Sequence, residues 1–187
     1  GQRLADVLAA KARASASRPA ERKQLLGRLG TLYAERLGRR DLAREAFRQA
    51  LALDPGYYKG LAFLAEDAQQ RGDHGAELAH LKRLAGLEEQ AGIDPEERAE
   101  VHARLAQLHR RAGRHEEAER QALLALRHQP QHGPALHLLD ERYTNTGRFA
   151  ELADLLLRRA AVEMEAVERR DALARRARIL EDRKSTR

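Results

Sequence analysis

Residues 99–132 constrain the fold of this chain more than any other stretch, because they have the pattern of two helices joined by a tight turn. The first helix carries packing residues on one face, at spacings of one and three, and these are Leu105, Ala106 and His109. Gly113 ends that helix, since glycine accepts the left-handed conformation that follows many helix ends. Small side chains line one face of the second helix and allow a close approach to the first: Ala118, Ala122 and Ala125. Pro130 cannot continue a helix, so the hairpin ends there.

This hairpin resembles one tetratricopeptide repeat (TPR), a helix pair of about 34 residues in which small and large residues take fixed positions. The pattern occurs in register in three further stretches, so we expect four repeats, at residues 23–57, 58–91, 99–132 and 133–167. Residues 2–16 resemble an orphan second helix, and residues 168–184 resemble an orphan first helix. The resemblance implies an all-α fold for the whole chain, a right-handed superhelical TPR solenoid of about ten helices in antiparallel pairs.

The four expected repeats are not identical. The turn of the first repeat, at residues 37–40, has one residue more than the family pattern, and Asp140 stands where the family has a small residue. Leucines replace the small residues in the second helix of the second repeat: Leu78, Leu81, Leu84 and Leu87. Odd and even repeats therefore differ, and we expect a true period of about two repeats. Because half repeats stand at both ends, we favour a segment of a longer array over an array that the orphan helices cap.

Composition and charge also favour helices. Hydrophobic residues make up 42% of the chain but aromatic residues only 4%, so the core must be mostly leucine and alanine, which suits close helix packing. The net charge is +6, yet charged residues make up 34% of the chain and both signs are mixed throughout, as on solvated helix faces. We interpret the bias toward alanine, leucine and arginine as that of a GC-rich bacterial genome.

No stretch of the sequence indicates a membrane helix or a targeting segment. No apolar run approaches the roughly 18–20 residues that a membrane helix needs, and no signal peptide is recognisable. We therefore expect no membrane insertion, and the compartment stays open with the cytoplasm favoured. The chain has no cysteine, which excludes disulfides and cysteine-based zinc sites.

The sequence also lacks the motifs of a metal site or an enzyme. His128 and His132 are four residues apart, but Pro130 lies between them, so they do not share a regular helix face. His102 and His109 occupy core-facing positions of a first helix, where we expect ordinary packing. There is no zinc-protease pattern, nucleophile elbow, phosphate-binding loop or dinucleotide fingerprint. We expect no metal, no cofactor and no catalytic residues.

The resemblance implies that the first helices line a concave groove where partners dock. The residues opposite the packing positions are the expected groove residues: Arg28, Thr31, Glu35, Lys59, Phe63, Glu66, Gln70, Arg104, Gln107, Arg111, His137, Glu141, Asn145 and Arg178. Phe63 is the one large apolar residue among them, so it either anchors a partner side chain or packs against the neighbouring repeat. One TPR subclass grips a carboxylate with lysine and asparagine at set positions. That clamp is not matched, because Thr31, Glu66, Gln107 and Glu141 stand where its asparagine is expected.

We expect a scaffold or adaptor that binds another protein or a peptide in the groove. One alternative is binding of nucleic acid or an acidic ligand through a basic patch near the C-terminus: Arg169, Arg170, Arg175, Arg176 and Arg178. We favour instead a solvated helix at that place, because no basic stripe interleaved with aromatic residues is present. A third interpretation is self-assembly, in which orphan end helices of two chains complete each other's repeats and form a homo-oligomer.

Overall fold

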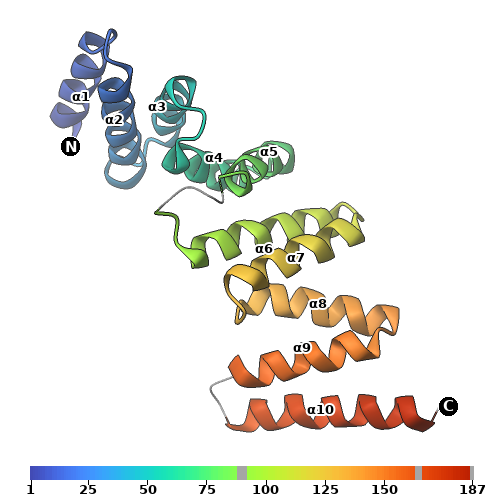
Figure 1. Cartoon of the computed structure of the whole chain (residues 1–187). Helices are drawn as coiled ribbons and strands as arrows, with labels where there is room; N and C mark the ends of the chain where they lie inside the picture. The colour runs from blue at the N-terminus through green and yellow to red at the C-terminus, as the bar shows by residue number, and fades with distance from the viewer. Residues whose placement is uncertain (88–91, 163–165, 186–187) are drawn as a thin grey trace. The chain divides into compact units, whose positions relative to one another are not determined.

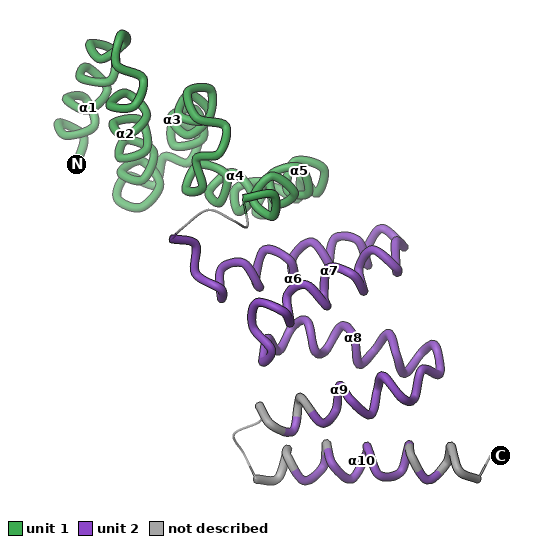
Figure 2. The backbone as a smooth tube through the Cα atoms, in the orientation of Figure 1, with its two compact units in different colours: residues 1–90 green, residues 91–187 purple. Residues whose placement is uncertain are grey.

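The computed structural model describes residues 1–87, 92–162 and 166–185, and every element in these ranges is helical (Figure 1). Side chains are described except those of residues 158, 159, 161–169, 172, 180 and 182–187. The chain divides into two compact units, unit 1 at residues 1–90 and unit 2 at residues 91–187 (Figure 2). Each unit is considered by itself.

Unit 1 is a series of helices in which each packs against the next. The helices are α1 (Gln2–Ala14), α2 (Pro19–Thr31) with the π-helical turn η1 (Leu32–Arg36), α3 (Arg40–Leu53), α4 (Tyr58–Gln70) and α5 (His74–Ala85). One core cluster joins the first three helices through small and branched residues: Ala5, Leu8, Ala12, Leu25, Leu26, Leu29, Leu32, Ala46 and Ala50. These residues recur at helical spacing, and burial of that face holds the helices together.

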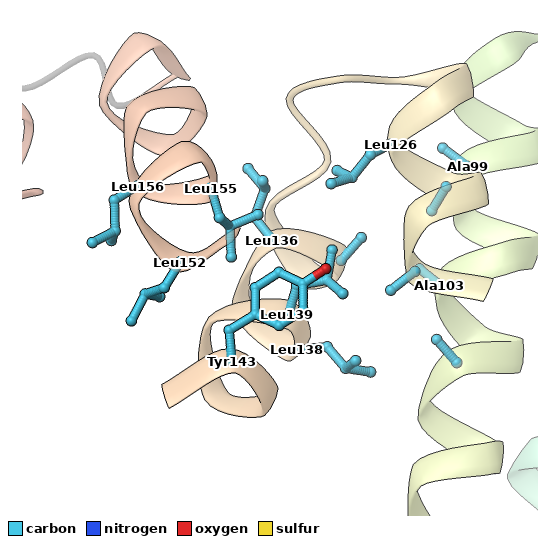
Figure 3. Packing of buried hydrophobic residues seen from close by; sticks show 14 residues of the cluster. Ala99, Ala103, Leu126, Leu136, Leu138, Leu139, Tyr143, Leu152, Leu155 and Leu156 are labelled. Atoms are coloured by element: carbon cyan, nitrogen blue, oxygen red, sulfur yellow. The ribbon is translucent and has the colours of Figure 1, made fainter. Parts of the chain in front are cut away.

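Unit 2 follows the same plan with α6 (Pro95–Arg111), α7 (His115–His128), α8 (Gly133–Thr146), α9 (Phe149–Val162) and α10 (Ala166–Ser185). Alanines on α6 and α7 form one side of its core, among them Ala103, Ala106 and Ala122. Leucines of α8 and α9 fill the other side, where Leu136 and Leu155 point toward each other (Figure 3). The small residues allow α6 and α7 to lie close together, and the leucines fill the space between α8 and α9.

The turn between α6 and α7 forms as the sequence predicts. Gly113 has a φ of 71°, in the left-handed region that glycine adopts without strain. The amide of Arg114 donates to the carbonyl of His109 at 2.9 Å and the amide of Gly113 to that of Arg110 at 3.0 Å. These bonds satisfy carbonyls at the end of α6, and α7 can then start at His115 and run antiparallel to α6.

The extra residue expected in the first repeat's turn is absorbed by the preceding helix. The last turn of α2 widens into η1, in which the amide of Leu37 donates to the carbonyl of Leu32, five residues back, at 3.2 Å. The bond that closes the turn runs from Arg39 to Tyr33 and spans six residues, against five at the end of α6. Because the insertion is taken up before α3 begins, Ala43 and Phe47 still face the core.

Two expectations about the fold can be judged from these helices. The expectation of an all-α chain is confirmed over the residues described, and the helices succeed one another in antiparallel pairs. No helix in those ranges is both long and apolar enough to cross a bilayer. The boundaries of the four repeats and two half repeats stay a prediction, as does the right-handed superhelical course.

Gly30 is required by the close approach of α2 to α3, and this makes a testable prediction. A Cβ atom at Gly30 would lie 2.7–2.9 Å from ring carbons of Phe47, which is buried in the core. We expect Gly30→Ala to destabilise the protein by about 1–3 kcal/mol, because the ring or the helix must shift. Gly75→Ala is the matched control, since its Cβ would meet nothing closer than 3.7 Å.

Chemical denaturation of both variants checks this prediction. Gly75 lies in the first turn of α5, so alanine there should leave the free energy of unfolding unchanged or raise it by up to about 1 kcal/mol through helix propensity. An unfolding midpoint for Gly30→Ala equal to that of the parent would show that the contact with Phe47 does not set the spacing of these helices.

Candidate interaction surfaces

Unit 1 carries a hollow of about 600 Å³ between α1, α2 with η1, and the start of α4. We call it the first hollow, and it is lined by Leu4, Leu8, Gln24, Gly27, Arg28, Thr31, Leu32, Glu35, Arg36, Tyr57 and Lys59. Four of the expected groove residues, Arg28, Thr31, Glu35 and Lys59, therefore lie together. Leu4 and Leu8 of α1 were not among the expected groove residues, because only first helices were expected to line the groove.

Gly27 and Tyr57 shape one wall of the first hollow. A Cβ at Gly27 would lie 2.2 Å from the Tyr57 hydroxyl oxygen, so the missing side chain leaves room for the phenol. Burial raises the pKa of the Tyr57 hydroxyl, and the Lys23 ammonium, 5.7 Å from the ring centroid, opposes that shift. Lys23 is held in turn by Asp54, with the Nζ–Oδ2 distance at 2.8 Å. Tyr57 is thus a fixed, neutral wall of the hollow.

The charges around the first hollow are not neutralised by any residue that the structure describes. The side chains of Arg28, Arg36 and Lys59 are exposed and make no ion pair with any other residue of the described ranges. Glu35 is the one acidic residue in the lining, and it too is exposed and pairs with no described residue. Three cations and one carboxylate leave an excess of two positive charges facing solvent.

Unit 2 carries a smaller hollow of about 360 Å³ at the ends of α6 and α8 and the start of α7. We call it the second hollow, and it is lined by Arg110, His115, Ala118, Leu138, Glu141, Arg142, Asn145 and Thr146. Two expected groove residues, Glu141 and Asn145, are among them. Its charges are paired internally, because Arg110 is bonded to Glu141 and the Arg142 guanidinium lies 3.5 Å from a Glu119 carboxylate oxygen.

The remaining expected groove residues of unit 2 are placed differently. Arg104 and Gln107 are half-buried on α6, and Arg111 is exposed near its end. His137 is exposed on α8, with its Nε2 3.6 Å from Glu141. None of these four lines the second hollow. Whether they contact a partner stays a prediction.

Phe63, Glu66 and Gln70 on α4 belong to a separate cluster that links α4 to α3. The Phe63 ring is half-buried, and its centroid lies 4.8 Å from the ring centroid of Phe47. The Arg40 guanidinium lies 5.0 Å from the centroid of the Phe63 ring. Glu66 accepts hydrogen bonds from Gln70 at 2.9 Å and from Arg40 at 3.5 Å. The ring of Phe63 thus contacts residues of its own unit, and its role as an anchor for a partner stays a prediction.

Asp67 lies at the centre of this cluster and is a structural feature that was not predicted from the sequence. Its carboxylate is 2% exposed and accepts from Arg44 at 2.7 Å, from Arg71 at 3.0 Å and from Arg40 at 3.4 Å. Burial raises the pKa of Asp67, but the hydrogen bonds and charges of Arg44 and Arg71 outweigh burial and hold the pKa below its usual value. An aspartate on the apolar face of a helix, between Leu64 and Ala68, was the available signal.

An equivalent contact joins α7 and α8 with the charges exchanged. Arg44 of α3 pairs with Asp67 of α4, and 75 residues further along the chain Glu119 of α7 pairs with Arg142 of α8. Glu119 also pairs with Arg148. The fifth residue of the second helix is therefore a cation in α3 of unit 1 and an anion in α7 of unit 2.

The arginines of α10 do not act alike. The Arg175 guanidinium lies 3.2 Å from the buried carboxylate of Asp140 and 3.1 Å from the Thr144 hydroxyl, so it holds α10 to α8. This contact accounts for the aspartate at a position where the family pattern has a small residue. Arg170 and Arg178 are exposed and Arg176 is half-buried, while the side chain of Arg169 lies outside the described residues. A continuous basic patch at this helix stays a prediction.

The histidines of unit 2 take part in packing and capping. His102 stacks on His128 with ring centroids 5.5 Å apart, and its Nδ1 lies 2.8 Å from the Gln121 amide oxygen. His132 caps α8, since its Nδ1 accepts from the amide of Ala135 at 3.4 Å. Within the described part of the chain, no three potential metal ligands come together.

Comparison with known proteins identifies one repeat in the chain. The family model described as tetratricopeptide repeat matches residues 24–57, which include most of α2, with η1 and α3. The chain therefore contains a tetratricopeptide repeat at these residues. The prediction of the TPR family from the sequence is thus confirmed. TPR domains are typically protein-interaction modules and usually non-catalytic.

Solved structures support a TPR-like fold along most of the chain. A crystal structure of MamA matches with a TM-score of 0.56 at 16% identity, over 95% of this chain and 89% of the MamA chain. A point mutant of MamA matches with a TM-score of 0.54 at 20% identity, over 86% of this chain and 95% of that chain. At these identities the likeness concerns the fold of the TPR protein alone. No curated protein sequence matches the chain.

The Asp67 cluster makes a prediction about stability and pH. We expect Asp67→Asn to lower the free energy of unfolding by about 2 kcal/mol near neutral pH, because three arginines lose their shared anion. This loss of stability is smaller than that expected for a fully buried ion pair, because the arginine side chains are 25–42% exposed. Glu66→Gln is the control, because Glu66 is an exposed neighbour that also contacts Arg40.

The effect should depend on pH in one direction. The folded chain holds the pKa of Asp67 below that of the unfolded chain, about 3.9, so the stabilisation is present above that value and is lost as the pH falls through the folded-state pKa. Urea unfolding as a function of pH should show the difference between Asp67→Asn and the parent shrinking in acid. A difference that stays constant down to about pH 2 would contradict the role of the carboxylate charge.

Proposed function

We propose that this TPR protein is a non-catalytic scaffold or adaptor that binds a partner protein or peptide on the faces of its first helices. The observation that carries the proposal is the first hollow, in which Arg28, Thr31 and Lys59 come together beside an apolar wall. The second hollow, with Glu141 and Asn145, supports a second contact region on unit 2. The identity of the partner is left to experiment.

Preorganisation is the mechanism that this arrangement supports. The backbone around each hollow belongs to helices held by buried alanine and leucine, and the wall residue Tyr57 is fixed by packing on Gly27. A partner segment would therefore meet a surface that is already formed. Binding then costs the ordering of the partner but little ordering of this chain, which favours affinity for a short segment.

A distinct alternative is nucleic-acid binding through the arginines of α10. The contact of Arg175 with Asp140 weighs against it, because that guanidinium already holds two helices together. The two functions differ in salt dependence. Affinity for nucleic acid falls steeply with salt, by roughly 0.7–0.9 log units per log unit of salt for each phosphate contacted. Binding of a protein in a partly apolar hollow depends on salt far less.

Affinity capture from a lysate of the native cells tests the proposal with a matched pair of variants. Lys59→Glu changes the first hollow, and Lys82→Glu makes the same change of charge on an exposed residue of α5 outside both hollows. We expect a discrete protein to be retained at low and moderate salt by the parent and by Lys82→Glu, and to be lost with Lys59→Glu. We choose Lys59 over Phe63 because removing the Phe63 ring would also remove its packing on Phe47.

Two results would count against the scaffold. Recovery of nucleic acid alone, washed off by moderate salt, would favour the arginines of α10 instead. Equal loss of the protein from both lysine variants would mean that overall charge governs retention and that the hollow does not. Thermal unfolding of each variant, carried out first, excludes misfolding as the cause of a loss.

A further inference from the structure

The cations of the first hollow differ from the arginines around Asp67 in the same unit, because only the latter have a partner within the described residues. Arg40, Arg44 and Arg71 are all bonded to Asp67, so their charges are used inside the fold. Arg28, Arg36 and Lys59, in contrast, pair with nothing in the described ranges and share a hollow with a single acid, Glu35. Unpaired cations gathered in a concave place attract an anion by their combined field. The first hollow therefore has a charge that an acidic partner would neutralise.

An apolar wall stands next to these cations. Leu8 and Leu32 are buried at the base of the first hollow, and Leu4 is 50% exposed at its edge. Burial of an exposed leucine side chain against another apolar group is favourable, because it removes apolar surface from water. The hollow thus offers two kinds of contact side by side, one for a negative charge and one for an aliphatic side chain.

We propose that the first hollow binds a peptide segment in which an aspartate or glutamate lies close to an aliphatic side chain. The acid is held among Arg28, Arg36 and Lys59, and the aliphatic group lies on Leu4, Leu8 and Leu32. This inference rests on the proposed function and specifies the chemistry of its partner. A volume of about 600 Å³ suits a few side chains rather than a whole domain.

The hollow fits a peptide better than a nucleic acid. Single-stranded nucleic acids bind on aromatic platforms where successive bases stack. Tyr57 is the one aromatic residue in the lining, its hydroxyl packs against Gly27, and the rest of the apolar wall is leucine. Leucine matches an aliphatic side chain in shape and gives no stacking surface. The second hollow lacks the same preference, because its arginines, Arg110 and Arg142, are already paired with the carboxylates of Glu141 and Glu119.

Selection from a library of short random peptides displayed on phage tests this inference on the full chain. We expect the enriched peptides to share an acidic residue within a few positions of leucine, isoleucine, valine or methionine. A synthetic, fluorescently labelled copy of the best peptide is then titrated by anisotropy. Its affinity should fall about tenfold or more with Arg28→Glu, because one attractive charge becomes repulsive. It should fall several-fold with Leu4→Ala, and replacing the peptide's acid by its amide should weaken binding to the parent.

Two variants serve as matched controls for these changes. Arg127→Glu makes the same charge change as Arg28→Glu on an exposed residue of α7 that lies outside both hollows and outside the expected groove. Val7→Ala removes a side chain from α1 that is 49% exposed, close to the 50% of Leu4, and that does not line the hollow. Both controls should leave the affinity for the peptide unchanged. All four replaced side chains are exposed, so we expect the unfolding midpoints to stay near that of the parent.

The outcomes separate this inference from the proposed function. Enriched peptides without an acid, or an affinity that Arg28→Glu does not change, would overturn the inference. If Arg127→Glu abolished binding and Arg28→Glu did not, peptide binding would stand but would belong to another face, and the inference about the first hollow would fail. If no peptide were enriched and a labelled single-stranded oligonucleotide bound with loss on Arg28→Glu, both the inference and the scaffold would fail.

Discussion

The close approach of neighbouring helices through alanine and glycine is the constraint on which the rest of this protein depends. Gly30 lies against the Phe47 ring, and the helix pair α6–α7 meets through alanines such as Ala106 and Ala122. Side chains of this size bring backbones close wherever they meet. Leucines fill the wider spaces, as between α8 and α9, and complete the core of each unit. A chain with 4% aromatic residues can build the core of each unit in this way.

Charged residues have two separate roles in this fold: some pair with a neighbouring helix, and others face solvent in the first hollow. Arginines and acids that face a neighbouring helix are bonded to each other, as at Asp67 and Asp140. Cations that face the first hollow are left for solvent or for a partner. The net charge of +6 does not distinguish the two groups, and neither does their residue type. Only the position of each charge relative to the next helix tells whether it holds the fold together or remains available for binding.

The sequence was sufficient for the elements of the fold and for part of the candidate site. Glycine at helix ends and small residues at helical spacing predict the helix pairs, because both depend on local geometry. The extra residue in the turn at residues 37–40 was predicted from the sequence. That it would be accommodated by a wider, π-helical last turn of α2 was not predicted, because an extra residue can be accommodated in several ways. Arg28, Thr31 and Lys59 were predicted as groove residues and they do share a hollow.

The parts that escaped prediction depend on contacts between distant residues. Leu4 and Leu8 of α1 complete the first hollow only because α1 packs on α2. Asp140 departs from the family pattern and Asp67 drew no prediction, yet Arg44 lies 23 residues from Asp67 and Arg175 lies 35 residues from Asp140 in the chain. Such partners have no fixed spacing, so the repeat pattern does not reveal them. For the Phe63 ring, packing against the neighbouring repeat was one of the two alternatives that the sequence left open, but the residues that contact the ring, Phe47 and Arg40, were not predicted.

The exchanged charges at Arg44–Asp67 and Glu119–Arg142 give the helix pairs individual identities. Repeats with interchangeable surfaces can be shuffled, duplicated or docked out of order with little loss. Here, α3 placed against α8 would bring Arg44 to Arg142, and α7 placed against α4 would bring Glu119 to Asp67. Like charges would meet at a half-buried contact in both wrong orders. These two ion pairs therefore disfavour a wrong order of the helices. A design that recombines these repeats has to transfer both residues of an ion pair together.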